Sequence, residues 1–281
     1  MSNDPEAADF DPPAPVPCEY CGKPRYTRGV WLAGTIKWPP GAPELCDCPE
    51  AIAAREAEER AKREKEAAAR KMAQVAQIVG DSGMSARFLR RTFATFQPTE
   101  RNQRALRVCK MYADEFGEKL PSNNPEPGRN GLFITGPKGT GKTHLAAAIA
   151  NQLMQDGTPV VCMTMIDLLD RIKQTFEKQK QWGVTEAGVM KVYKEVPLLI
   201  IDDMGKEPAT EWAVSKIYAI INARYEAYLP TIVTTNYSDG DLVRRLTPKD
   251  TGDATTADAT IDRLREMCAA IVTTGESWRS K

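Results

Sequence analysis

Short apolar runs alternate with helical patterns through the second half of the chain. Strands that alternate with helices predict an α/β fold, in which helices cover both faces of a parallel sheet. The runs that we expect to form strands are Leu132–Thr135, Pro159–Thr164, Val196–Asp202, Thr231–Thr235 and Ala269–Thr273. The pattern therefore predicts a parallel five-stranded sheet flanked by helices.

The first 83 residues follow a different pattern. Residues 1–17 are acidic and rich in proline, which predicts a disordered tail, and residues 18–49 hold two cysteine pairs. Residues 50–79 are mostly Ala, Glu, Lys and Arg without Gly or Pro, which predicts a helix. A solvated helix that links two modules fits this composition better than a long coiled coil. We expect four parts: a tail (1–17), a cysteine module (18–49), a helical linker (50–83) and an ATPase domain (84–281).

Composition narrows the class of protein. Lys plus Arg and Asp plus Glu both total 38 among 281 residues, so the net charge is zero. Any contact with nucleic acid must then come from a local basic patch. The sequence has neither the long apolar run of a membrane helix nor the basic start of a signal peptide. We expect a cytoplasmic protein without a membrane partner, in which seven cysteines bind metal or stay as free thiols.

A glycine-rich sequence follows the first predicted strand and precedes a predicted helix, roughly Thr143 to Gln155. It matches the phosphate-loop (Walker A) pattern and reads Gly136-Pro137-Lys138-Gly139-Thr140-Gly141-Lys142-Thr143. Glycines let the backbone N–H groups approach phosphates, and the helix N-terminus adds its positive end. We expect Lys142 to reach the β- and γ-phosphates of ATP and Thr143 to ligate Mg²⁺. His144 is counted with this site, although packing in the first helical turn is its more ordinary role.

Two other predicted strands end in polar residues. Asp202 and Asp203 follow a run of four apolar residues, and Asn236 follows the next strand. The carboxyl ends of parallel strands face the ligand crevice. We expect Asp202 to join the Mg²⁺ shell, and Asp203 and Asn236 to orient the attacking water. Capping or turn roles are the alternatives for Asp203 and Asn236.

The cysteine module has the spacing of a metal site. Cys18 and Cys21 form one pair, Cys46 and Cys48 the other, and residues 22–45 between them have the composition of a small β-ribbon. Zn²⁺ takes four soft ligands in a tetrahedron, which two cysteine pairs supply. Four free thiols are the alternative. The remaining cysteines are scattered and are expected in the core: Cys109, Cys162 and Cys268.

Longer stretches around these motifs resemble the DnaC/DnaI/IstB branch of AAA+ ATPases, and within it the helicase loaders. The stretches are Gly131–Asn151, Leu198–Gly205, Arg224–Asn236, Ile261–Leu264 and Gly275–Arg279. The resemblance covers about residues 84–281. It implies a slow ATPase, stimulated by DNA or a partner, that loads a replicative hexameric helicase onto single-stranded DNA, and it suggests a phage or prophage system. The zinc module would dock on the helicase, and the AAA+ domain would self-associate.

The resemblance also assigns roles to residues. Lys142 and Thr143 match Walker A, Asp202 and Asp203 match Walker B, Asn236 matches sensor 1, Arg263 the arginine finger and Arg279 the sensor 2 arginine. Most AAA+ proteins carry Glu at the second Walker B position, and the shorter Asp leaves the hydrolysis rate open. For Arg263, an ordinary salt bridge on the helix Ala257–Cys268 is the alternative.

The family places its DNA contacts between the second and third strands, here Ile166–Glu195. Basic residues mix there with the aromatic residues Phe176, Trp182 and Tyr193, as backbone tracking with base stacking requires. Lys178 and Trp182 are our candidate DNA contacts. The alternative is an amphipathic helix whose core face is Leu168, Leu169, Ile172 and Phe176. Two other functions stay open: a transposition helper of the IstB type, and an adaptor that binds ATP but barely hydrolyses it.

Overall fold

The chain forms two compact units, Met1–Glu66 and Ala67–Lys281. The helix predicted over residues 50–79 is confirmed as α1 (Pro49–Val79). It begins in the first unit and ends in the second. The computed structural model describes residues 13–32, 35–37, 43–79, 84, 86–126, 128–177, 184–206 and 209–275. The predicted tail therefore lies mostly outside the described residues.

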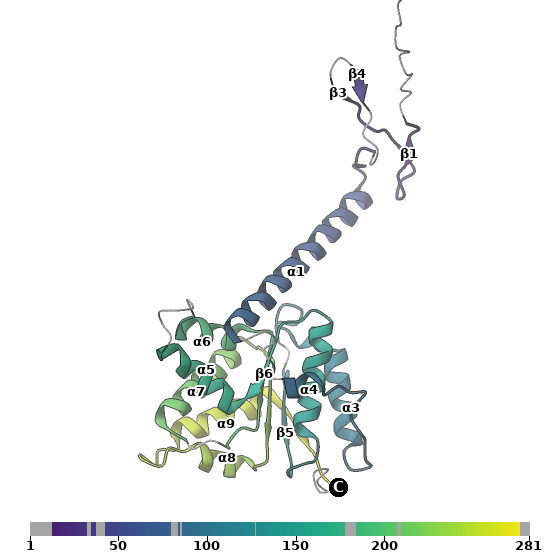
Figure 1. The fold of residues 1–281 in the computed structure, drawn as a ribbon. Helices are drawn as coiled ribbons and strands as arrows, with labels where there is room; N and C mark the ends of the chain where they lie inside the picture. Colours follow the sequence, from purple (N-terminus) through teal and green to yellow (C-terminus); the bar gives the residue numbers. More distant parts are fainter. Residues whose placement is uncertain are drawn as a thin grey trace, which may run out of the picture. The chain divides into compact units, whose positions relative to one another are not determined.

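The first unit is built from two short antiparallel ribbons ahead of α1 (Figure 1). They pair β1 (Val16–Pro17) with β2 (Pro24–Arg25), and β3 (Val30–Leu32) with β4 (Thr35–Lys37). The ribbon predicted between the cysteine pairs is confirmed. Among the described residues of this unit, the buried cluster consists of Cys18, Cys46, Cys48 and Ala51. A cluster of so few small side chains contributes little hydrophobic stabilisation, which favours a cross-link such as a metal ion.

The second unit contains the predicted parallel sheet. Its order is β6-β7-β8-β5-β9, and all neighbouring strands are parallel. The strands are β5 (Gly131–Thr135), β6 (Val160–Thr164), β7 (Leu198–Asp202), β8 (Thr231–Thr235) and β9 (Cys268–Val272). Every residue of β7 and β8 is buried. Central strands buried on both faces explain why these runs are apolar throughout instead of alternating.

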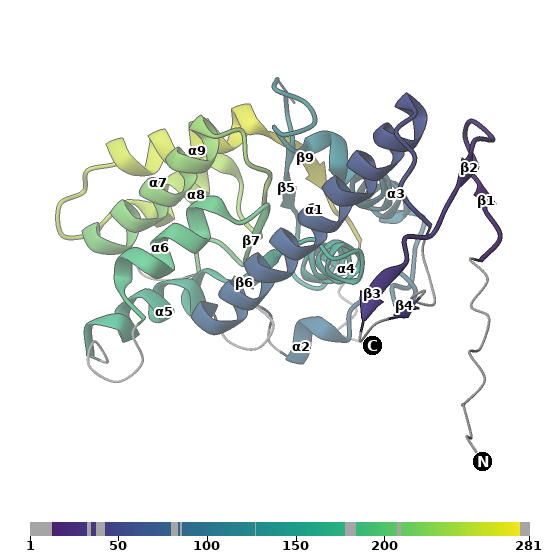
Figure 2. The same ribbon diagram turned by 90° about the horizontal axis from the view of Figure 1, so that it is seen from above.

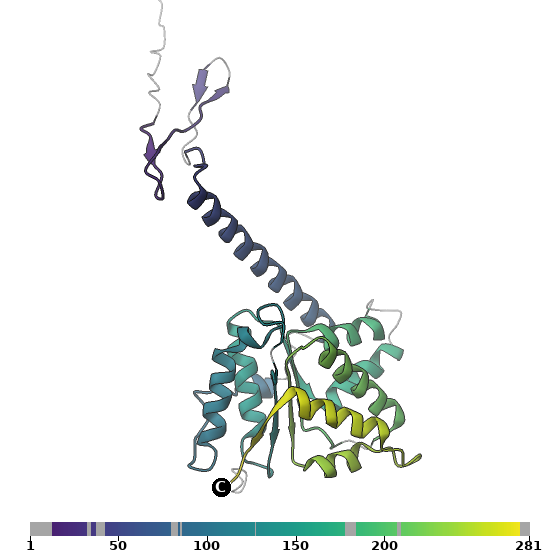
Figure 3. The same ribbon diagram turned by 180° about the vertical axis from the view of Figure 1, so that it is seen from behind.

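Helices cover both faces of the sheet (Figures 1 and 3). One face packs against α2 (Ala86–Leu89), α3 (Gln103–Asp114) and α4 (Lys142–Gln155), near a short 3₁₀ helix, Phe116–Lys119. The other face packs against α5 (Met165–Glu177), α6 (Glu186–Glu195), α7 (Glu211–Glu226), α8 (Asp239–Leu246) and α9 (Thr255–Met267). Figure 2 shows α7 and α9 side by side. Cys109, Cys162 and Cys268 are buried in this unit, as expected. Among the described residues, none of the helices has the length and hydrophobicity that crossing a membrane requires.

A buried arginine ties α7 to the sheet. Arg224 is fully buried, and its guanidinium donates to the carbonyl oxygens of Val196 at 2.8 Å and Pro230 at 2.6 Å. These carbonyls lie just before β7 and β8. Burial lowers the pKa of Arg224 to about 9, which still leaves the side chain charged at neutral pH. The N–H groups of the Arg224 guanidinium thus give hydrogen bonds to carbonyl oxygens at the starts of two strands. They fix the end of the sheet that lies opposite the phosphate loop.

Candidate nucleotide-binding site

The phosphate loop joins β5 to α4, and its backbone requires glycine at two positions. A Cβ on Gly136 (φ +143°) would lie 2.1 Å from the carbonyl oxygen of Thr273. Gly141 precedes α4 at φ +99°, and a Cβ there would lie 2.7 Å from Cε2 of Phe96. Larger residues would therefore displace the loop. The predicted order of strand, loop and helix is confirmed.

Lys142 lies against the loop with only 5% of its surface exposed. Its Nζ donates to the carbonyl oxygens of Gly136 and Pro137, each at 2.7 Å. The Thr140 hydroxyl donates to the same Pro137 oxygen at 2.9 Å. The Lys142 ammonium is thus already removed from water. Exchanging carbonyl oxygens for phosphate oxygens would add charge attraction with little further desolvation.

The Thr234 hydroxyl connects Asp202, the last residue of β7, with Asp203, the residue that follows the strand. It donates to Oδ1 of Asp202 at 2.6 Å and accepts the backbone N–H of Asp203 at 2.9 Å. Burial raises the pKa of Asp202, while the hydrogen bond from Thr234 opposes the rise and the charge of Asp203 adds to it. A divalent cation at this carboxylate would favour its charged form.

The donor set here fits Mg²⁺. The Thr143 hydroxyl, in the first turn of α4, also opposes the rise in the Asp202 pKa. A hydroxyl and a carboxylate beside a phosphate loop are hard oxygen ligands of the kind that Mg²⁺ prefers. Thr143 and Asp202 would hold the ion, and the ion would neutralise phosphate charge.

A cavity of about 240 Å³ lies where these elements meet. It is lined by Arg91, Lys138, Gly139, Gly141, Lys142, Thr143, His144, Asp203, Lys206 and Asn236. The structure thus brings most of the residues expected around the nucleotide to one cavity. Arg91 and Lys206 were not among them. Arg91 belongs to a stretch rich in basic residues, Arg87–Lys110, whereas no sequence signal marks Lys206.

His144 has a packing role at the edge of this cavity. Its Nε2 lies 2.9 Å from the carbonyl oxygen of Thr92, which can only accept, so this nitrogen carries the proton. The edge of the Phe96 ring meets the imidazole with centroids 5.1 Å apart. Burial lowers the pKa of His144, which favours the neutral ring. These contacts favour the ordinary role over a catalytic one.

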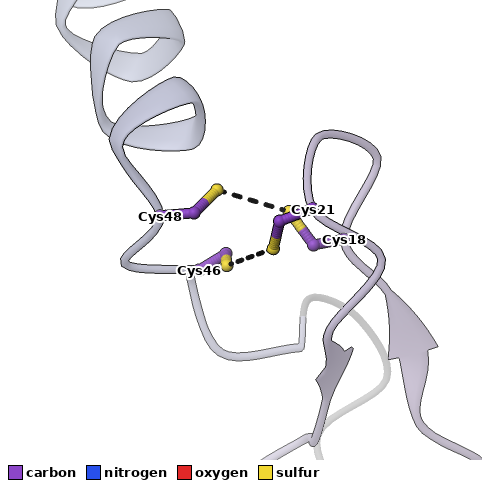
Figure 4. A group of neighbouring side chains, drawn as sticks. All are labelled: Cys18, Cys21, Cys46 and Cys48. Atoms are coloured by element: carbon purple, nitrogen blue, oxygen red, sulfur yellow. Dashed lines mark hydrogen bonds between the residues drawn. The ribbon is translucent and has the colours of Figure 1, made fainter.

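The four cysteines of the first unit converge from two loops (Figure 4). The Sγ atoms of Cys18 and Cys48 are 4.0 Å apart, those of Cys21 and Cys46 are 3.5 Å apart, and all four lie within 4.8 Å of one another. Four sulfurs around a tetrahedral Zn²⁺ at about 2.3 Å lie about 3.8 Å apart. Hydrogen bonds from the backbone of Cys21 and Tyr20 lower the pKa of Cys18 to about 6, whereas burial raises the pKa of Cys48 to about 12. A bound cation would favour the thiolate form of all four cysteines. The predicted ligand set fits a zinc ion.

Residues 126–281, more than half of the chain, match the model of a family described as IstB-like ATP-binding protein. The chain belongs to this family.

Curated relatives of this IstB-like chain include named helicase loaders. It is 29% identical over 160 residues to "Replicative helicase loader DnaC" of Buchnera aphidicola subsp. Schizaphis graminum, covering 57% of this chain and 61% of that protein. It is 26% identical over 189 residues to "Replicative helicase loader DnaI" of Bacillus subtilis, covering 66% and 58%. The chain therefore spans about three fifths of the length of these relatives.

Solved structures share the fold. A crystal structure of the DnaC helicase loader aligns with a TM-score of 0.53 at 25% identity, covering 68% of this chain and 100% of that one. A structure of DnaI aligns with a TM-score of 0.52 at 24% identity, covering 69% and 93%. The five-stranded sheet with helices on both faces is thus the AAA+ fold that the sequence resemblance predicted.

Arg263 lies on α9 and contacts α7 of its own chain. Its Nε donates to Oδ1 of Asn222 at 2.6 Å, and its guanidinium carbon lies 5.0 Å from the ring centre of Tyr218. Arg263 is not among the described residues that line the cavity. Its assignment as an arginine finger therefore stays a prediction that needs a second copy. Arg279 lies outside the described residues.

The expected DNA surface is only partly described. Lys178 and Trp182 lie outside the described residues. Leu168, Leu169 and Ile172 form the buried face of α5, as the amphipathic alternative predicts. Phe176 does not join them: its side chain is 50% exposed, and its ring meets the Trp212 ring edge to face with the two centroids 6.1 Å apart. Tyr193, the third aromatic residue of this region, is fully buried and cannot stack on bases. That expectation was wrong because Tyr193 packs into the core beneath α6.

Proposed function

We propose that the chain is an ATP-dependent loader that places a replicative hexameric helicase on single-stranded DNA. The observation that carries the proposal is the cavity in which the phosphate loop, Asp203 and Asn236 face one another. The relatives named as replicative helicase loaders support the same client. Because the chain spans only part of their length, helicase loading remains a proposal for the whole protein.

Hydrolysis follows from the proposed roles. Lys142 neutralises the β- and γ-phosphates, and Thr143 and Asp202 would hold the Mg²⁺ that spreads the developing charge. Asp203 and Asn236 line the cavity and would orient the attacking water. The water oxygen bonds to the γ-phosphorus, the bond to the bridging oxygen of ADP breaks, and the water's proton passes to solvent or Asp203. ADP and phosphate leave.

The other partners follow from the remaining surfaces. The cysteine module, with zinc bound, would dock on the helicase. The region between β6 and β7, with Lys178 and Trp182, would contact single-stranded DNA by charge and stacking. The exposed Phe176 beside Trp212 supports an aromatic surface there, and Lys173 lies 5.4 Å from the centre of the Trp212 ring.

The arginine-finger assignment predicts activity shared between copies. Arg263→Ala is expected to bind ATP normally but to lose hydrolysis, because its guanidinium would serve the cavity of a neighbouring copy. Mixing Arg263→Ala with Lys142→Ala should restore part of the activity, since some interfaces then combine an intact cavity with an intact arginine. Steady-state phosphate release with single-stranded DNA present measures this. If mixed assemblies are confirmed and show no rescue, Arg263 does not act in the cavity of a neighbouring copy.

A transposition helper is the second candidate, since the matching family model carries the IstB name. Both candidates hydrolyse ATP and differ in their client. The loader should bind the replicative helicase of its own host, whereas the helper should bind a transposase. An adaptor that barely hydrolyses ATP would show no phosphate release above background, with or without single-stranded DNA.

A further inference from the structure

Lys206 brings an additional cation to the reactive end of the nucleotide cavity. Its ammonium forms an ion pair with the carboxylate of Asp203, three residues earlier. Both side chains line the cavity together with Lys142 and Asn236. The carboxylate proposed to orient water is therefore neutralised by a lysine of its own chain.

The turn that carries Lys206 is fixed to the neighbouring strand. Asp203 has a left-handed φ of +58°, a conformation that few residues other than glycine, asparagine and aspartate adopt. Thr234 holds it there, since its hydroxyl accepts the N–H of Asp203 and its carbonyl accepts the N–H of Met204, both at 2.9 Å. A Cβ on Gly205 (φ +87°) would lie 2.5 Å from Cδ1 of Leu242. The backbone that presents Lys206 to the cavity is thus built into the fold.

The ion pair itself contributes little to folding. The Lys206 side chain is 40% exposed and that of Asp203 is 21% exposed. Ion pairs at this exposure contribute little to the free energy of folding, because solvent screens their attraction. A weak pair can exchange partners when a stronger anion arrives. A γ-phosphate carries more negative charge than one carboxylate, so the cavity offers Lys206 a better partner once ATP is bound.

We propose that Lys206 is a positioning residue that responds to the γ-phosphate. Without a γ-phosphate its ammonium neutralises Asp203; with ATP bound it moves to the γ-phosphate and leaves Asp203 free to orient the water. ADP lacks that phosphate, so Lys206 stays on Asp203. The inference rests on the proposed ATP-hydrolysing function of the same cavity.

Dissociation constants for β,γ-methylene-ATP and for ADP test the proposal. Both are measured on the full chain with Mg²⁺ for wild type, Lys206→Ala and Lys206→Arg. Lys216→Ala is the matched control, because Lys216 is also ion-paired, with Glu186, and does not line the cavity. Lys206→Ala should weaken binding of the ATP analogue about tenfold, as loss of a charge-assisted contact does, and binding of ADP less than about twofold. Lys206→Arg should retain the preference for the ATP analogue, and Lys216→Ala should change neither constant.

Two results would overturn the proposal while wild type still binds both nucleotides. Equal weakening for the ATP analogue and ADP would mean that Lys206 acts only through the general field of the cavity. Unchanged affinity for both would mean that it never leaves Asp203. Failure of wild type to bind either nucleotide would instead refute the proposed function of the cavity, and the role of Lys206 with it.

Discussion

Replacing Lys142 with alanine is expected to weaken ATP binding by about 2 kcal/mol or more, roughly thirtyfold in the dissociation constant. The reason is the position of the side chain. Its Nζ lies 2.7 Å from the loop carbonyl oxygens of Gly136 and Pro137 and is already removed from water, so binding phosphates costs it little further desolvation. Alanine removes the charge and leaves those carbonyls without this donor.

Titration with a fluorescent ATP analogue measures the loss. Lys216→Ala, which removes a lysine outside the cavity, serves as the control and should bind like wild type. Thermal unfolding of Lys142→Ala shows whether the AAA+ domain is intact. Equal affinity of wild type and a folded Lys142→Ala for the ATP analogue would refute the assignment of the phosphate loop.

The largest effect on folding is expected in the cysteine module. Freshly purified protein should carry about one zinc per chain, and a four-cysteine zinc site stabilises a small domain by about 10–16 kcal/mol. Cys48→Ser should lose the metal and unfold the first unit, because the buried cluster among its described residues holds little besides the cysteines. The second unit, with its own two cores, should stay folded.

Metal analysis together with limited proteolysis separates these outcomes. Cys109→Ala is the matched control, since Cys109 is a buried cysteine of the second unit, and it should keep the zinc. Absence of zinc from wild type prepared without chelators would refute the site. Retention of full zinc occupancy by Cys48→Ser would show that this cysteine is not a ligand.

The features that could be predicted well from the sequence are those that residues close together in the sequence determine. The strands of the sheet are short apolar runs, and β7 reads Leu-Leu-Ile-Ile because both its faces are buried. The phosphate loop needs glycine where its backbone approaches Thr273 and Phe96, so its motif is compact and visible. The cysteine cluster likewise follows from spacing, because two close pairs can meet around one ion.

The features that the sequence left hidden depend on contacts between distant segments. Arg224 reads as an ordinary helix residue until β7 and β8 bring the carbonyls of Val196 and Pro230 to its guanidinium. Arg91 reaches the nucleotide cavity only because α2 and the following turn pack on α4. Tyr193 looked available for stacking because helical periodicity alone did not identify which side of α6 is buried.

The most direct test of the account is helicase loading onto a closed circle of single-stranded DNA with a short annealed oligonucleotide. A ring-shaped helicase cannot thread onto a circle, so release of the oligonucleotide reports that the ring was opened and closed around the strand. The host's replicative helicase is mixed with ATP and either wild type or Lys142→Ala. We expect wild type to accelerate release strongly and Lys142→Ala to lose most of that effect. Release at the same rate with and without the wild-type chain would contradict the account.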